Sequence, residues 1–154
     1  YRTGKLVRFD KVMYHAQYEA TKETTVPSGY IVPHEFGYII DNLKLHGVTV
    51  QTLDKNKEYV GEQFVVDSLQ HDAQMFQKHF SATAYGQYLN KHIKFKKGDY
   101  IISMNQPLSN LIFYLLEPES DDGLVHWNFF DSYFEKLKAE KKPLIYPVFK
   151  YYER

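Results

Sequence analysis

Seven histidines are the residues of this chain best suited to hold a metal ion. A zinc motif of the His-x-x-Glu type requires a glutamate three residues after a histidine, and none of the seven histidines has one. No His-x-x-x-His pair occurs, and His71 and His79, eight residues apart, have no further ligand nearby that would complete a set. The chain has no cysteine, which excludes thiolate ligands and disulfides. The sequence therefore predicts no metal site and no cofactor in this chain.

Patterns for nucleophilic catalysis and phosphate binding are also missing from the sequence. The nucleophile motif Gly-x-Ser-x-Gly does not occur. The two predicted strand-to-helix turns, "VPHE" and "MNQP", contain none of the glycines that let a backbone approach a phosphate. We therefore expect no catalytic residue here, and we expect that this chain alone is not an enzyme.

Four polar residues follow two predicted strands and are the candidate ligand-binding residues. His34 and Glu35 follow "YIV", and Asn105 and Gln106 follow "YIISM". If those strands are parallel neighbours, the four side chains meet at the carboxyl ends of the strands, where open α/β sheets bind ligands. A second interpretation stays open, because first-turn polar residues and an asparagine cap also stabilise helix starts. An autonomous ligand-binding or enzymatic module using this crevice is one alternative function.

Acidic and aromatic side chains near the end of the chain have two interpretations each. The acidic stretch "EPESDDG" lacks the alternating oxygen-ligand spacing of a calcium loop, so we expect a solvated turn. Trp127 and the phenylalanines that follow it could form the exposed platform of a carbohydrate-binding domain, a second alternative function. Their helical spacing with Phe134 favours packing in the core instead.

Hydrophobic periodicity predicts the elements that must position these residues. An amphipathic stripe predicts a helix over about residues 34–45, from Phe36, Ile39, Ile40 and Leu43. Flanking strands make a strand-helix-strand unit over residues 30–53, which is long enough for parallel pairing. The run "LSNLIFYLL" after Pro107 predicts a buried helix. We expect an α+β fold in which a mixed sheet of about five to seven strands packs with two or three helices.

The two ends of the chain are expected to lie at the margins of this sheet. Residues 6–20 alternate in polarity as a strand does, so we expect residues 1–26 to form an interdomain segment or an edge strand. Pro143 and Pro147 predict that the last segment lies at an edge or outside the sheet. The length of 154 residues predicts a single domain, 1–154, and a first residue other than Met favours a fragment of a longer chain.

Charge and hydropathy limit the expected partners. Nineteen basic and nineteen acidic side chains cancel, and basic residues do not cluster, so a nucleic-acid partner is not expected. No apolar run approaches the length that a bilayer requires, so no membrane span is expected.

Three segments of the chain together resemble a known family. They are "GYIVPHEFGYIIDNLKLHGVTVQTL", "GDYIISMNQPLSNLIFYLLEPESDDGLVHWNFFDSYFE" and "YPVFK". They resemble the region downstream of the catalytic domain in a group of secreted bacterial zinc carboxypeptidases of the carboxypeptidase A superfamily. The resemblance covers residues 26–149 and is most specific in "LLEPESDDGLVHWNFFD".

The resemblance implies a non-catalytic, C-terminal accessory domain of a metallopeptidase. It implies a parent hydrolase, secreted or periplasmic, whose zinc belongs to an upstream peptidase domain. The expected partners are that domain and a peptide or cell-wall substrate. Because the family's zinc ligands lie upstream, no catalytic residue is carried over to this chain.

Overall fold

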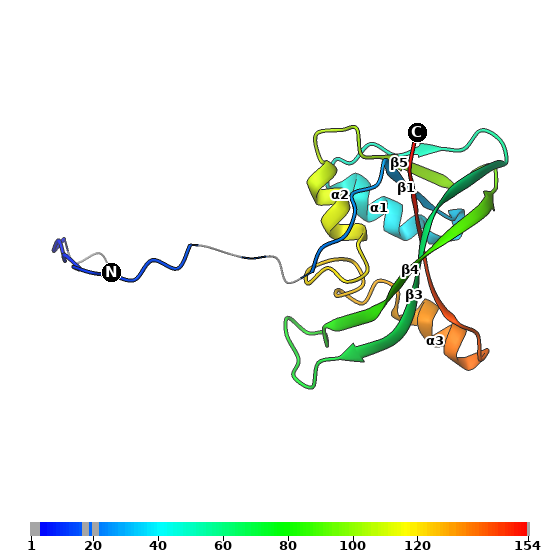
Figure 1. Ribbon diagram of the computed structural model, residues 1–154. Coiled ribbons are helices and arrows are strands. Elements are labelled where there is room, and N and C mark those ends of the chain that lie inside the picture. Colours follow the sequence, from blue (N-terminus) through cyan, green and yellow to red (C-terminus); the bar gives the residue numbers. More distant parts are fainter. Residues whose placement is uncertain (1–3, 17–18, 20–21, 154) are drawn as a thin grey trace.

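The fold is built on one six-stranded sheet. The structure, a computed structural model, describes residues 4–16, 19 and 22–153 (Figure 1). The strands are β1 (Gly29–Val32), β2 (Gln51–Thr52), β3 (Lys57–His71), β4 (Ala82–Phe95), β5 (Tyr100–Ser103) and β6 (Leu144–Tyr151). Their order in the sheet is β2-β5-β1-β6-β3-β4.

In the part of the chain that the structure describes, three α-helices and one short 3₁₀ helix accompany the sheet. The elements are η1 (His34–Phe36), α1 (Gly37–Leu45), α2 (Ser109–Leu116) and α3 (Asp131–Ala139). All three α-helices contribute side chains to one large apolar cluster together with one face of the strands. A smaller cluster lies on the opposite face, formed by Ile31, Leu53, Phe95, Phe149 and Tyr151. The expected α+β fold, with its strand and helix numbers, is confirmed.

The amphipathic stripe of the first helical segment is confirmed. Phe36, Ile39, Ile40 and Leu43 are all buried against the sheet. The helix ends at Leu45, as predicted, and Gly47 adopts a φ of 88° directly after the cap residue His46. Glycine has no Cβ, so it takes this left-handed conformation without steric cost.

The mixed character of the sheet was predicted wrongly, since every strand pair among the described residues is antiparallel. The strand-helix-strand unit over 30–53 exists, but β5 lies between β1 and β2 and is antiparallel to both. β1 and β2 therefore run in the same direction without pairing. β5, which comes later in the chain, forms the backbone hydrogen bonds with β1 and β2 that a parallel pair would have formed between them.

The position of β6 was also predicted wrongly, because this strand is central rather than peripheral. It pairs with β1 on one side and with β3 on the other. Its register with β3 shifts between Gln63 and Val65, where the partners jump from Phe149 to Ile145. Pro147 lies inside this irregularity, and a proline without an N–H is tolerated in a sheet at such a bulge.

The N-terminal segment does not add a strand to the sheet. Residues 4–16 project away from the folded body, and no strand occurs among the described residues before Gly29 (Figure 1). The edge-strand alternative for residues 1–26 is therefore wrong for the part that the structure describes. Residues 1–3, 17, 18, 20 and 21 of that prediction lie outside the described part.

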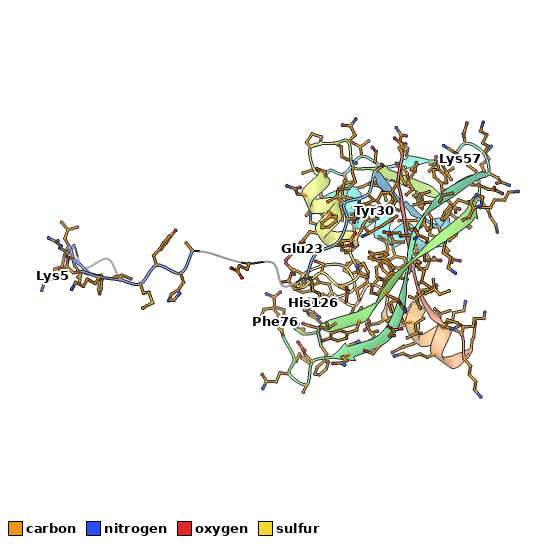
Figure 2. All side chains as sticks on the ribbon, in the orientation of Figure 1. Lys5, Glu23, Tyr30, Lys57, Phe76 and His126 are labelled. Carbon is orange, nitrogen blue, oxygen red and sulfur yellow. The ribbon has the colours of Figure 1, made fainter. Side chains whose placement is uncertain are left out.

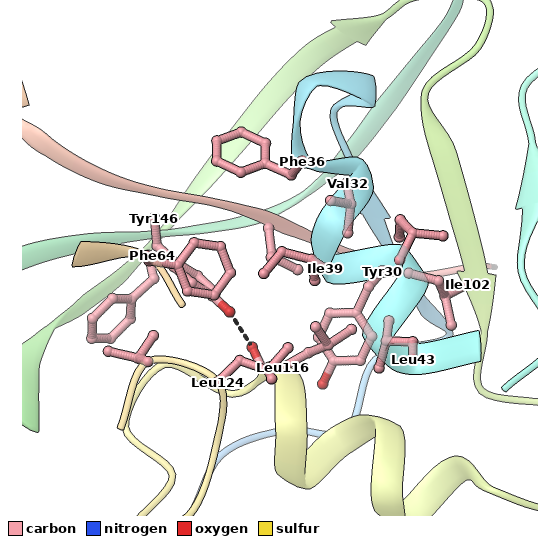
Figure 3. Packing of buried hydrophobic residues seen from close by; sticks show 14 of the residues in the cluster. Tyr30, Val32, Phe36, Ile39, Leu43, Phe64, Ile102, Leu116, Leu124 and Tyr146 are labelled. Atoms are coloured by element: carbon pink, nitrogen blue, oxygen red, sulfur yellow. Dashed lines mark hydrogen bonds between the residues drawn. The ribbon is translucent and has the colours of Figure 1, made fainter. Parts of the chain in front are cut away.

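Helix α2 covers the sheet with one face. Ile112 and Leu116 are fully buried, whereas Leu115 is only partly buried and Tyr114 is 44% exposed. Figure 3 shows Leu116 within the apolar cluster, where its carbonyl accepts a hydrogen bond from the hydroxyl of Tyr146 at 3.0 Å. The prediction of a buried helix is therefore correct for one face of α2, and the opposite face is exposed or partly buried.

Truncating Leu116 tests this packing. Leu116→Ala should lower the free energy of unfolding by about 2–5 kcal/mol, because it removes contacts and leaves a cavity in the core. Leu45→Ala, at a side chain that is 87% exposed, is the matched control and should change stability little. Urea unfolding of both variants measures the difference, and equal stabilities would contradict the burial of Leu116.

Candidate functional site

The four candidate residues from the sequence do not form one crevice. β1 and β5 are antiparallel, with Val32 opposite Tyr100 and Gly29 opposite Ser103. His34 therefore lies at the end of the sheet where β5 begins, and Asn105 lies beyond the end where β5 finishes. The carboxyl-end rule for parallel strands does not apply to this pair.

Each of these residues has a local contact that accounts for its position. The backbone N–H of His34 donates to Oδ1 of the buried Asp99 at 3.0 Å, and Glu35 is exposed. The side chain of Gln106 accepts from the Thr49 N–H at 2.8 Å and donates to the Thr49 carbonyl at 3.1 Å. Asn105 is not the cap of α2, because the helix begins four residues later without a side-chain cap.

Trp127 does not present a free aromatic platform. Its ring stacks on the ring of His79, with centroids 4.4 Å apart and an interplanar angle of 29°. Its indole N–H donates to the carboxylate of Asp122. The residue is partly buried and precedes α3, so it belongs to the turn that leads into the helix.

A network of polar side chains connects the β3–β4 loop to the start of α3. Nε2 of His71 lies 2.9 Å from Oδ2 of Asp131, which also accepts from Asn128 at 3.0 Å. Oδ1 of Asn128 lies 2.7 Å from Nδ1 of His79. Asn128 has a φ of 64°, a left-handed conformation that asparagine tolerates better than most residues. These contacts fix the loop geometry.

One face of the molecule carries a cleft of about 860 Å³. Its walls come from the segment before β1, the start of β4, the second half of α2 and the loop that follows α2. Aromatic lining residues are Tyr85, Tyr88, Phe113 and Tyr114, and charged ones include Glu19, Lys22, Glu23, Glu117, Glu119 and Asp121. Figure 2 labels Glu23 and a further lining residue, His126, near the point where the N-terminal segment leaves the body.

One residue that lines the cleft, Glu117, forms a buried ion pair with Lys150, which lies behind the lining. Nζ of Lys150 lies 2.8 Å from Oε2 of Glu117, and the two side chains are 1% and 7% exposed. The hydroxyl of Tyr30 donates to Oε1 of Glu117 at 2.5 Å, and that of Tyr88 donates to Oε2 at 2.7 Å. The carboxylate therefore accepts from three donors, which offsets much of the cost of burying its charge.

Strand register explains why these groups meet. Tyr30 of β1 is the direct partner of Lys150 in β6, so both side chains lie on the same face of the sheet. That face is the one covered by the helices, because Tyr146 and Val148 alternate onto it from the same strand. Pro118 then holds Glu117 in extended conformation at the end of α2, with φ −74° and ψ 125°.

The ammonium of Lys150 has further contacts besides the carboxylate. Nζ lies 3.9 Å from the centroid of the Tyr88 ring and donates to Oγ1 of Thr24 at 2.9 Å. Burial lowers the pKa of Lys150, and the negative charge of Glu117 acts in the opposite direction. Burial, reinforced by the Glu117 carboxylate, raises the pKa of Tyr30 and of Tyr88 well above 10.0. Both phenols therefore remain hydrogen-bond donors at neutral pH.

Sequence reasoning missed this network. Glu117 was expected in a solvated acidic turn, and that expectation is wrong for this residue, which is 6% exposed. A signal was present in "LIYPVFKYY", where Lys150 falls on the same alternating side as Tyr146 and Val148. A lysine in that register requires an anionic partner, and a glutamate directly after a strongly apolar helix is a suitable one.

The residues that the structure describes contain no group of three or more His, Asp or Glu side chains arranged to hold a metal ion. Their helices are all too short or too polar to cross a bilayer.

Comparison with known proteins finds three fungal relatives. Carboxypeptidase 2 of Trichophyton rubrum is 28% identical over 114 residues, which cover 70% of this chain and 21% of the relative. The proteins of the same name from Trichophyton tonsurans and Trichophyton equinum are each 29% identical over 99 residues, or 63% of this chain. This chain is similar to a region of fungal carboxypeptidases. It spans about a fifth of their length. Neither a family model nor a solved structure matches the chain.

The buried tyrosines predict how the stability of the fold changes at alkaline pH. Their folded-state pKa values lie above the ordinary 10.0, so the unfolded chain loses phenolic protons first as the pH rises. The buried phenols contribute their full stabilisation of the folded state below about pH 10, and this contribution is lost as the pH rises above that value. Lys150, with its lowered pKa, acts in the opposite sense, but one lysine is outweighed by three tyrosines.

Urea titrations between about pH 8 and pH 11 should therefore show stability falling above pH 10, with a shallower slope for Tyr88→Phe. Tyr85→Phe, at an exposed ring on the same strand, is the control and should keep the slope of the unaltered chain. A slope that is the same in all three proteins would contradict the burial of the Tyr88 phenol.

Proposed function

We propose that this chain is a non-catalytic accessory domain of a zinc carboxypeptidase-like protein. It packs on an upstream peptidase domain or positions substrate for it. The observation that carries the proposal is the match of 114 residues of this chain to only about a fifth of Carboxypeptidase 2 from Trichophyton rubrum. Most of such a relative lies outside the matched region, which is what an accessory region of a longer enzyme requires.

The site geometry supports a binding role over a catalytic one. Glu117, which lines the cleft, and Lys150 behind it neutralise each other, and Glu117 also accepts hydrogen bonds from the hydroxyls of Tyr30 and Tyr88. A general base or nucleophile must reach substrate with an available lone pair. The lone pairs of the Glu117 carboxylate already accept from Lys150, Tyr30 and Tyr88, so they are not available to a substrate. What the cleft offers a ligand is its aromatic walls and its outer carboxylates.

Zinc belongs to the upstream domain in this proposal. The His71 and Asp131 side chains, the best candidate ligand pair here, are joined to each other and to Asn128 by hydrogen bonds. Such a pair does not fit a tetrahedral zinc site, which takes at least three protein ligands. A secreted or periplasmic parent is part of the proposal, as is the bacterial group whose motifs the chain resembles.

The proposal predicts a specific effect of removing this domain from the longer protein. The upstream reading frame should encode His-x-x-Glu and a later third histidine, and this chain alone should not turn over peptides. Deleting residues 22–153 should raise the KM for extended peptides about tenfold or lower the yield of folded peptidase, while kcat on a short blocked substrate changes little.

Matched preparations with and without the domain measure this effect. The control is a Leu45→Ala variant of the longer protein, which alters an exposed residue of the domain and should behave as the unaltered enzyme. Identical KM, kcat and folding yield after deletion would contradict the proposal, and so would an upstream frame without a zinc motif.

A further inference from the structure

The outer part of the cleft already holds a cation from the chain itself. Nζ of Lys22 lies 2.8 Å from Oε1 of Glu119 and 5.1 Å from the centroid of the Tyr85 ring. A cation within about 6 Å of an aromatic face gains electrostatic attraction from the ring. The carboxylate of Glu119 and the ring of Tyr85 thus form a binding site for an ammonium or guanidinium group. The side chain of Lys22 is 52% exposed, so this occupant is held at the rim rather than locked inside.

The charge of the described cleft lining favours a second cation. Glu117 is neutralised from below by Lys150, which leaves the carboxylates of Glu19, Glu23, Glu119 and Asp121. Lys22 is the ammonium that faces them within the described lining. The carboxylates therefore outnumber the ammonium, and cleft walls of low dielectric focus the resulting field on an incoming cation.

A second ammonium of the chain, that of Lys150, is held by the same types of group. Lys150 occupies an equivalent arrangement, over the ring of Tyr88 and against the carboxylate of Glu117. The same fold thus pairs a lysine with a tyrosine ring and a glutamate twice, once buried and once at the cleft mouth. The outer copy is reachable from solvent, since Tyr85 is 42% exposed.

We propose that the cleft binds a peptide segment bearing a lysine or arginine side chain, whose cation replaces Lys22 between Tyr85 and Glu119. The peptide backbone lies against the aromatic wall of Phe113 and Tyr114, and the segment containing Lys22 acts as a built-in competitor. The proposed function supplies only the identification of this peptide as substrate of the longer enzyme. Binding itself is a property of this chain.

Calorimetric titration of the chain tests the inference with two capped pentapeptides, one with a central arginine and one with citrulline, its neutral isostere. The arginine peptide should bind about tenfold more tightly than the citrulline peptide. Lys22→Gln should tighten the arginine peptide several-fold by removing the competitor. In that background Glu119→Gln and Tyr85→Ala should each weaken it about tenfold. Asp41→Asn, at an exposed carboxylate on α1, is the control and should leave affinity unchanged.

Three results would overturn the inference. They are equal affinity for the arginine and citrulline peptides, no gain from Lys22→Gln, and tighter binding of a neutral oligosaccharide than of the arginine peptide. Circular dichroism of each variant shows whether it is folded, and Tyr85→Phe, which keeps the ring, should retain binding. Failure of peptide binding here would leave the domain-deletion experiment unaffected, so the two proposals fail separately.

Discussion

The buried pair of Glu117 and Lys150 is the interaction on which the arrangement of this fold depends. It joins the end of α2 to the central strand β6, and its hydroxyl donors bring in β1 through Tyr30 and β4 through Tyr88. Thr24 adds the segment before β1. A charge taken out of water is costly unless it is paired and hydrogen-bonded, so each of these elements must be in place before the pair is tolerated. The pair therefore specifies one arrangement of five separate parts of the chain.

The backbone around Lys150 shows the same constraint. β3 approaches β6 so closely that a Cβ at Gly61 would overlap the carbonyl oxygen of Lys150. Glycine at this position lets the two strands approach while the lysine side chain crosses to the helical face. Above it, the cleft is walled by parts of the chain that are distant in sequence, including Lys22, Tyr85 and Tyr114. A neutralised ion pair beneath acidic and aromatic cleft walls suits a binding role.

Local patterns in the sequence predicted much of the fold, but they did not predict which strands pair with one another. Helix α1 was predictable because its apolar stripe lies within one short segment of the sequence. The pairing of β5 with β1 and β2 was not, since the crossover alone equally allows a parallel pair. Pro147 argued against a central strand, and only the bulge opposite Gln63 makes its place in the sheet acceptable. The candidate site failed for the same reason, because it assumed a strand direction. The acidic turn was expected to be solvated, yet Glu117 is buried against Lys150, 33 residues further along the chain. The alternation in the last strand indicates an inward-facing lysine, but it does not identify the carboxylate that pairs with it.

A double-mutant cycle at Glu117 and Lys150 tests the central claim most directly. Urea unfolding of Glu117→Gln, Lys150→Met and the double variant gives the coupling energy between the two side chains. Each single change should cost about 3–5 kcal/mol, because it leaves the other charge buried without its partner. The double variant should cost clearly less than the sum, with a coupling of roughly 2–3 kcal/mol. Additive losses, with a coupling near zero, would contradict the account.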